Sequence, residues 1–155
     1  MPDSRKTAES KAESTALAGK VAFITGSGRG LGKTIAERLM RMGADIVLHD
    51  ISEEAPAKFG EVESLSALAA QFTRGGARAI AVTGDISDAD AVATMVVSAE
   101  QRLGPVAILI NCAGGDIGAD GNKPSPSTPT NFKLPDVTAV LNRNLIGTML
   151  MCRAI

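Results

Sequence analysis

Short apolar runs alternate along the chain with segments of helical periodicity. Four runs rich in β-branched residues end at glycine or polar residues, as buried parallel strands do, and they cover residues 20–25, 44–50, 78–83 and 106–111. Between these runs, apolar side chains recur at helical spacing over residues 31–42, 62–73 and 88–103. Glycines follow the helical segments as stop signals. The pattern therefore predicts strand and helix in regular alternation.

Three further segments complete the chain. Residues 52–60 are polar and contain proline, so they predict a loop, and residues 114–134 predict a longer irregular loop that forms one wall of a site. The last helix is predicted to begin near Pro135, a favoured first-turn residue, and to reach the chain end. Residues 1–18 lack a continuous apolar stretch and predict a disordered tail.

The alternation of elements predicts the fold class. Short crossovers between parallel strands are right-handed, which places a parallel sheet between two layers of helices. We expect residues 19–155 to form one α/β domain, a doubly wound parallel sheet of the Rossmann type with strand order 3-2-1-4. In this fold a ligand binds at the carboxyl ends of the strands, near the switch point between the first and fourth strands.

Composition narrows the class of partner to a small molecule. The chain has 155 residues and a formal net charge of -1, and its basic residues are scattered, which argues against nucleic acid or a membrane surface as a partner. No apolar run approaches the roughly 20 residues of a membrane span. Cys112 and Cys152 match no metal-binding spacing, so no metal site is expected, and free thiols fit a cytoplasmic protein.

A glycine-rich turn follows the first strand directly and leads into the first helix. The N–H groups at a helix start and the helix macrodipole attract a pyrophosphate, and missing side chains allow it to approach closely. The turn could be an ordinary flexible turn. Because it lies between a strand and a helix, the interpretation as a dinucleotide-binding site is much stronger. The candidate cofactor-binding residues here are Gly26, Ser27, Gly28, Arg29, Gly30, Leu31 and Gly32.

An acidic residue ends the second strand. Asp50 lies 18 residues beyond Gly32, where a carboxylate can accept hydrogen bonds from the hydroxyls of an adenosine ribose. The next residue is Ile51, so no basic side chain follows that would neutralise a 2'-phosphate. This favours NAD over NADP, although Arg29 in the turn keeps NADP as the less favoured alternative. Asp50 could instead be a helix cap or an exposed loop acid.

The pattern TGxxxGxG at residues 25–32 resembles that of the short-chain dehydrogenase/reductase family, and the resemblance extends over residues 20–155. It implies that Asp85 contacts the exocyclic amine of adenine and that Ile86 packs on the ring. Further along, residues 111–114 resemble the family's NNAG element, with Cys112 in place of its second Asn. This implies that Asn111 steadies the sheet, and that Ala113 and Gly114 line the ribose and nicotinamide path.

The resemblance also implies a catalytic role for Asn144, which matches the helix asparagine that holds the family's active-site lysine through a water. Each of these residues has a plainer interpretation. Asp85 could cap a turn, Asn111 could satisfy backbone groups at a strand end, and Asn144 could be a surface helix residue. His49 is the only histidine. It lies beside Asp50 at the adenosine end, which favours a structural or solvent-facing role over acid catalysis.

The implied activity is hydride transfer between NAD and a small-molecule secondary alcohol or ketone, of which this chain represents the cofactor-binding half. The family's chemistry uses a Ser, a Tyr and a Lys, and this sequence contains no tyrosine. We therefore expect the chain alone to be inactive, the later strands to be missing, and the parent protein to continue beyond Ile155 as a dimer or tetramer. A non-catalytic dinucleotide-binding module and a split-enzyme fragment are the alternatives. The substrate stays open.

Overall fold

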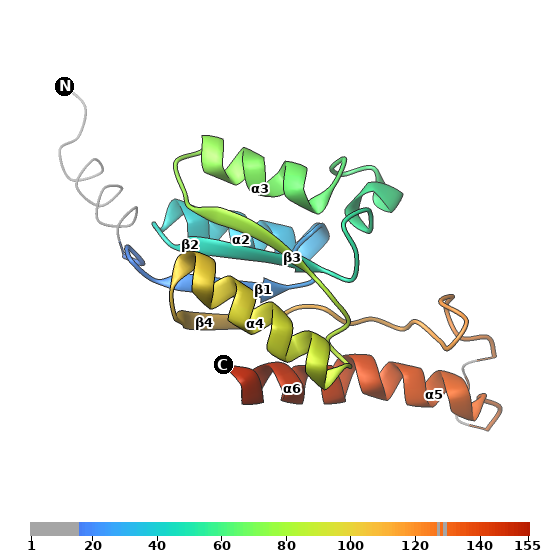
Figure 1. Cartoon of the computed structure of the whole chain (residues 1–155). Helices are drawn as coiled ribbons and strands as arrows, with labels where there is room; N and C mark the ends of the chain where they lie inside the picture. Colours follow the sequence, from blue (N-terminus) through green and yellow to red (C-terminus); the bar gives the residue numbers. More distant parts are fainter. Residues whose placement is uncertain (1–15, 127, 129) are drawn as a thin grey trace.

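Four parallel strands form the centre of the protein, in the order β3-β2-β1-β4 (Figure 1). The computed structural model describes residues 16–126, 128 and 130–155. The strands are β1 (Val21–Thr25), β2 (Asp45–Asp50), β3 (Ala79–Thr83) and β4 (Val106–Asn111). Both the predicted fold class and the predicted strand order are confirmed.

Helices cover both faces of the sheet (Figure 1). Helices α2 (Gly30–Arg41) and α3 (Leu65–Arg74) pack on one face, and α4 (Ala89–Leu103) and α6 (Gly147–Ala154) pack on the other. Successive side chains of a strand point to opposite faces, so Phe23 joins the core under α4 and α6 while Ile24 joins the core under α2 and α3. Burial on both faces explains why the strands are continuous apolar runs.

The boundaries of most elements agree with the pattern, and side-chain caps account for two helix starts. The predicted cap Asp88 precedes α4, and its Oδ1 accepts hydrogen bonds from the N–H groups of Asp90 and Ala91. Helix α3 begins at Leu65, three residues after the predicted start. The reason is Ser64, whose Oγ accepts the N–H of Ala67 at 3.0 Å and so stops the helix from extending backwards.

The segment between β2 and α3 is more ordered than a plain loop. It contains a 3-10 turn, η1 (Pro56–Phe59), with proline at its first position, and both Ala55 and Pro56 are buried. The prediction of a loop was wrong for this turn. A Cβ built on Gly28 would collide with the Pro56 ring, so the turn lies directly against the glycine-rich segment.

The predicted last helix is interrupted in the middle. It consists of α5 (Leu134–Leu141), a π-helical turn η2 (Asn142–Ile146) and α6. A π turn inside an α-helix is uncommon and is often found at functional sites. Helix α5 and the irregular connection before it extend past the carboxyl ends of the strands (Figure 1).

Most of the predicted amino-terminal tail lies outside the described residues. Residues 16–18 of it are described, and they belong to a turn in which the Leu17 N–H donates to the Met42 carbonyl at 2.8 Å. The Leu17 side chain packs against the core under α2 and α3. Over the described ranges, no helix combines the length and apolar character needed to cross a membrane.

The Asp88 cap gives a test of the fold. Asp88→Ala should lower the free energy of unfolding by about 1 kcal/mol, because two N–H groups at the start of α4 lose their acceptor. Asp88→Asn keeps an acceptor oxygen and should stay close to the wild type. Urea unfolding followed by circular dichroism measures both variants. Equal loss in the two would mean that the charge of Asp88, and not its hydrogen bonds, stabilises the helix.

Candidate functional site

The turn after β1 is attached to the residues that follow β4. The hydroxyl oxygen of Thr25 accepts the N–H groups of Cys112 and Ala113, each at 3.0 Å, and the Thr25 side chain is fully buried. Gly26 has a φ of 64°, in the left-handed region that favours glycine, and a Cβ built on it would lie 2.7 Å from the Cα of Ala113. The ends of the two strands at the switch point are therefore in direct contact.

Ser27 attaches the same turn to β2. Its N–H donates to the His49 carbonyl at 2.8 Å, and its Oγ accepts the His49 N–H at 2.9 Å. The Ser27 side chain is fully buried. The N–H and the hydroxyl of Ser27 are thus both used inside the fold, where they hold the turn in place, and a contact of Ser27 with a cofactor stays a prediction.

Of the remaining residues of the turn, Gly28 and Gly32 are buried against the fold, whereas Gly30 is exposed with open space around it. A Cβ on Gly28 would lie 2.5 Å from Oδ2 of Asp50, and a Cβ on Gly32 would collide with the Gly26 carbonyl. Leu31 and Arg29 lie on the exposed rim, with 69% of Leu31 accessible. The candidate cofactor-binding residues of the turn thus lie together at the carboxyl ends of the strands.

Glu61 is a neighbour of the turn that sequence reasoning missed. Its Oε2 accepts the N–H of Gly30, the first residue of α2, at 3.2 Å. The first turn of α2 has no acidic residue of its own, so Glu61 supplies the negative charge that the positive end of a helix favours. The distance of 31 positions between the two residues explains why no local pattern signalled the contact.

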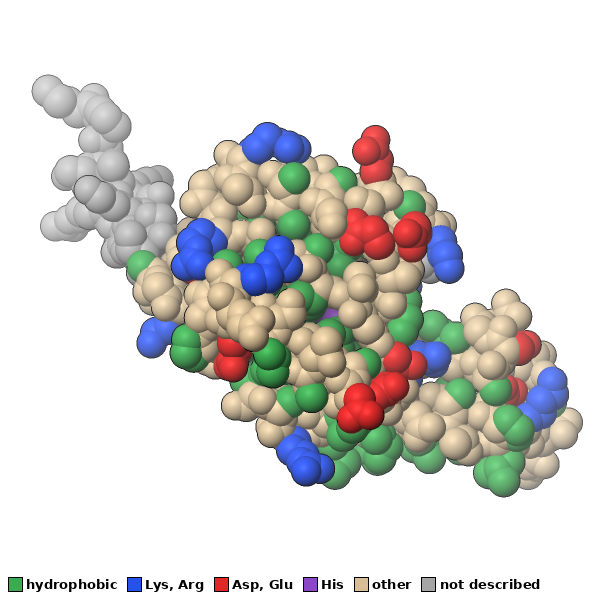
Figure 2. All heavy atoms as spheres, viewed as in Figure 1, with side chains coloured by type: hydrophobic (Ala, Val, Ile, Leu, Met, Phe, Trp, Pro, Cys, Tyr) green, Lys and Arg blue, Asp and Glu red, His purple; other side chains and the backbone are tan. Residues whose placement is uncertain are grey.

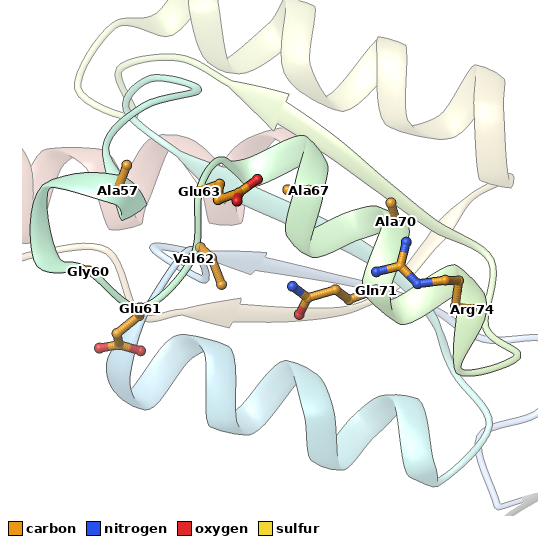
Figure 3. Close-up of a pocket in the computed structure, with 9 residues that line it drawn as sticks. All are labelled: Ala57, Gly60, Glu61, Val62, Glu63, Ala67, Ala70, Gln71 and Arg74. Atoms are coloured by element: carbon orange, nitrogen blue, oxygen red, sulfur yellow. The ribbon is translucent and has the colours of Figure 1, made fainter.

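Glu61 also borders a groove beside α3. The groove has a volume of about 670 Å³, and Glu63, Gln71 and Arg74 line it with Glu61 (Figure 3). None of the cofactor-binding candidates lines this groove. It therefore lies outside the site at the carboxyl ends of the strands.

Asp50 faces the glycine turn at the end of β2. Its Oδ1 accepts the Ile51 N–H at 2.8 Å, while its Oδ2 lies where a side chain on Gly28 would be. Its carbonyl accepts the N–H of Gly84, which follows β3, at 3.2 Å. The next residue, Ile51, has an apolar side chain that is 57% exposed. The geometry differs from a helix cap, because the carboxylate lies beside the turn and not at the start of the next helix.

The residues after β3 are placed at the same edge. Asp85 is exposed, and its Oδ1 accepts both the N–H and the hydroxyl of Ser87, at 2.8 and 2.7 Å. The plainer role of capping a turn is thus present. Ile86 is only 4% exposed and packs against Gly147 in the core under α4 and α6. A contact of either residue with adenine stays a prediction. Figure 2 shows Asp and Glu side chains gathered at this end of the molecule.

After β4, Asn144 bonds to the backbone, whereas the Asn111 side chain bonds to a side chain of α6. The Asn111 Nδ2 donates to the Cys152 sulfur at 3.4 Å, while its Oδ1 is buried and has no hydrogen-bond partner within the described part of the chain. Asn144 belongs to the π turn, and its side chain makes a pair of hydrogen bonds with the backbone of Gly115, at 2.9 and 3.0 Å. A Cβ on Gly114 would lie 2.5 Å from the Asn144 Oδ1. Asn144 therefore holds the chain leaving β4, and its implied link to a lysine stays a prediction.

His49 is buried, with 2% of its surface exposed, so of its two expected roles the structural one is confirmed. Its ring contacts both the glycine turn and the end of β3. Burial lowers the pKa of His49 below its ordinary value of 6.5, and the Gly84 carbonyl and the carboxylates of Asp50 and Asp85 oppose that shift.

Comparison with known proteins agrees with this geometry. The family model described as short chain dehydrogenase matches residues 20–155. A hydroxynaphthalene reductase-like protein of Metarhizium guizhouense is 36% identical over 110 residues, which are 71% of this chain and 38% of that protein. Gluconate 5-dehydrogenase of Gluconobacter oxydans is 38% identical over 98 residues, 63% of this chain and 35% of that protein.

Solved structures match as well. A dehydrogenase/reductase from Sinorhizobium meliloti superposes with a TM-score of 0.73 at 30% identity, over 94% of this chain and 52% of the other. A short chain dehydrogenase from Burkholderia cenocepacia, solved in complex with NADP, gives a TM-score of 0.73 at 30% identity, over 90% of this chain and 51% of the other.

The chain belongs to the short-chain dehydrogenase/reductase family. It spans less than half the length of the curated relatives reported above and about half the length of the two structures. Within the described ranges, no group of three or more His, Cys, Asp or Glu side chains is arranged to hold a metal ion.

The Thr25 hydroxyl gives a test of the site's framework. Thr25→Val should lower the free energy of unfolding by roughly 1–3 kcal/mol, because the N–H groups of Cys112 and Ala113 lose their shared acceptor. Thr25→Ser keeps the hydroxyl and is the matched control. Thermal and urea unfolding measure the difference. A Val variant as stable as the Ser variant would show that packing, and not these two hydrogen bonds, holds the strands together.

Proposed function

We propose that this chain forms the cofactor-binding half of an oxidoreductase that transfers hydride between NAD and a secondary alcohol or ketone. The observation that carries this proposal is the position of the Asp50 carboxylate beside Gly28, at the carboxyl end of β2 and close to the start of α2. A carboxylate in this position recognises the hydroxyls of an adenosine ribose. The family membership and the names of the relatives support the reaction class.

The residues present fit a dinucleotide. The Gly30 N–H at the start of α2 already binds an anionic oxygen, that of Glu61, so this amide points outward and can serve a pyrophosphate. Gly30 leaves open space where the pyrophosphate would approach, and Gly28 leaves room for the Asp50 carboxylate and the Pro56 ring beside it. Asp50 would hold the adenosine ribose, and Ala113 and Gly114 would border the nicotinamide end. The nicotinamide, when bound, supplies the atom that accepts or donates hydride.

The chain's own residues position the ligand. Asn144 fixes the backbone at Gly115 through two hydrogen bonds and so shapes the rim at the end of β4. His49 is buried at the adenosine end, and both of its ring nitrogens are engaged within the fold, which excludes it as the proton donor to a substrate. We assign no residue of this chain to the proton transfer.

Charge supports NAD as the preferred cofactor. A 2'-phosphate bound at the adenosine ribose would face Asp50, and Glu61 adds a second carboxylate beside the same turn. Two like charges about 4 Å apart repel by roughly 1–4 kcal/mol, depending on how well solvent screens them. Arg29 opposes this effect from the rim of the turn. The Burkholderia cenocepacia structure was solved with NADP, so a similar chain accepts the phosphorylated cofactor.

The cofactor preference can be measured by titration calorimetry. We expect the wild type to bind NAD more tightly than NADP. Asp50→Ala should raise the Kd for NAD by about ten-fold or more, because a charge-assisted hydrogen bond is lost, and should improve binding of NADP. Glu54→Ala removes an exposed acid nearby and is the matched control. Tighter binding of NADP by the wild type would overturn the assignment of NAD.

The contact of Glu61 with α2 generates a second prediction. Glu61→Ala should bind NAD roughly two- to five-fold more tightly, because the Gly30 N–H becomes available and a carboxylate beside the pyrophosphate is removed. Glu63→Ala removes a second acid of the same groove and should leave the Kd close to that of the wild type (Figure 3). Weaker binding by the Glu61 variant would instead mean that Glu61 holds the turn in its binding shape.

A further inference from the structure

We propose that His49 is a positioning residue whose ring links the glycine turn to the end of β3 and thereby sets the affinity of the site for a dinucleotide. The affinity part of this inference rests on the function proposed above. The link itself is a property of the protein without ligand. The proposal gives His49, a buried residue that touches no part of the proposed ligand, an indirect role in cofactor binding.

The ring of His49 makes two hydrogen bonds in opposite directions. Its Nδ1 accepts the N–H of Gly26 at 3.2 Å, and its Nε2 lies 3.0 Å from the carbonyl of Gly84. A carbonyl can only accept, so Nε2 carries the proton, and an N–H can only donate, so Nδ1 does not. The neutral Nε2-protonated tautomer is the form that makes both bonds.

The two bonds reinforce a junction that the backbone already forms. Ser27 exchanges hydrogen bonds with the backbone of His49, and the Gly84 N–H donates to the carbonyl of Asp50. The His49 ring also lies against Phe23, with the ring centroids 6.1 Å apart. The ends of β1, β2 and β3 therefore meet around one side chain.

Gly26 is constrained both by its backbone conformation and by its packing. It has a positive φ of 64° and lies against Ala113 with no room for a side chain. If the acceptor at Nδ1 were lost, a partly buried N–H would have no partner. The turn that carries Gly28 and Gly30 would then be held on this side only by the Ser27 bonds, and both residues belong to the proposed pyrophosphate site.

Protonation of His49 would remove that acceptor, because Nδ1–H would face the Gly26 N–H. The charged groups acting on the ring are Asp50 on its own strand and Asp85 after β3, which favour the proton. The contacts from β1 and the glycine turn, Phe23, Gly26 and Ser27, carry no charge. Burial outweighs the two acids and the Gly84 carbonyl, so the pKa of His49 lies below 6.5 and the folded protein keeps the neutral ring.

The sign of the pH dependence follows from this. At pH values above the pKa of the unfolded chain, about 6.5, the ring is neutral in both states and its contribution to stability is complete. As the pH falls below that value, the unfolded chain takes up the proton first, and stability is lost towards the pKa of the folded state. Affinity for a dinucleotide should decline at still lower pH, as the pH passes through the pKa of the folded protein and the ring itself takes up the proton.

The link can be tested on the protein without ligand. His49 is the only histidine, so long-range ¹H–¹⁵N spectra report its tautomer directly. We expect the Nε2-protonated form at pH 7.5 and a shift of the Gly26 amide that follows the titration of the ring. An Nδ1-protonated ring, or a Gly26 amide that ignores the titration, would overturn the link.

Two variants separate the bonds and test the effect on binding. His49→Asn places an oxygen where Nδ1 accepts from Gly26, whereas His49→Gln places a nitrogen where Nε2 donates to Gly84. We expect the Gln variant to bind NADH about ten-fold more weakly, since a buried N–H loses its acceptor, and the Asn variant to stay within roughly three-fold of the wild type. NADH fluorescence titration and melting curves at each pH measure these effects.

The pH profile distinguishes positioning from general loss of structure. The wild-type Kd for NADH should rise as the pH falls through the pKa of the folded-state ring, which lies below 6.5, and the Kd of the Asn variant should not. Equal weakening in both variants, or a wild-type Kd independent of pH, would overturn the positioning role. If the wild type binds no dinucleotide, the proposed function fails and the affinity part fails with it, while the ¹H–¹⁵N spectra still decide the link.

Discussion

The turn after β1 is held from two sides by hydrogen bonds from buried polar groups. On one side the Thr25 hydroxyl accepts two N–H groups from the chain after β4, and on the other Ser27 and Gly26 bond to His49 on β2. Because β1 lies between β2 and β4, these bonds bring the ends of its two neighbours to one place. The surface at the start of α2 depends on this constraint, since Ser27 is the residue of the turn whose buried side chain bonds to a neighbouring strand.

The sequence predicted the elements whose signals are local. Apolar runs ending at glycine marked the strands, and Asp88 marked the start of α4. The missed features depend on contacts between distant parts of the chain. The turn η1 (Pro56–Phe59) is ordered by packing of Pro56 near Gly28, and Glu61 reaches Gly30 across 31 positions. The π turn that carries Asn144 is too short for its apolar and polar residues to differ in spacing from those of the α-helix around it.

The structure brings residues of the candidate site together, and their roles in binding stay predictions. Asp50 and the glycine turn lie together as expected, because the carboxyl ends of parallel strands meet at one edge. Ser27 was expected to bind a cofactor, yet its polar groups both bond to His49. Sequence spacing places a residue at an edge, but it does not show whether the side chain faces the ligand or the core. That choice is made by the neighbouring strands.

The two ends of the candidate site are built differently. At the ends of β1, β2 and β3, His49 and Ser27 are buried and the backbone bonds of three strands converge. At the other end, the chain after β4 is exposed at Gly114 and Gly115 and is held chiefly by the Asn144 side chain. Changes of sequence in the long connection beyond Gly115 would leave the buried junction intact.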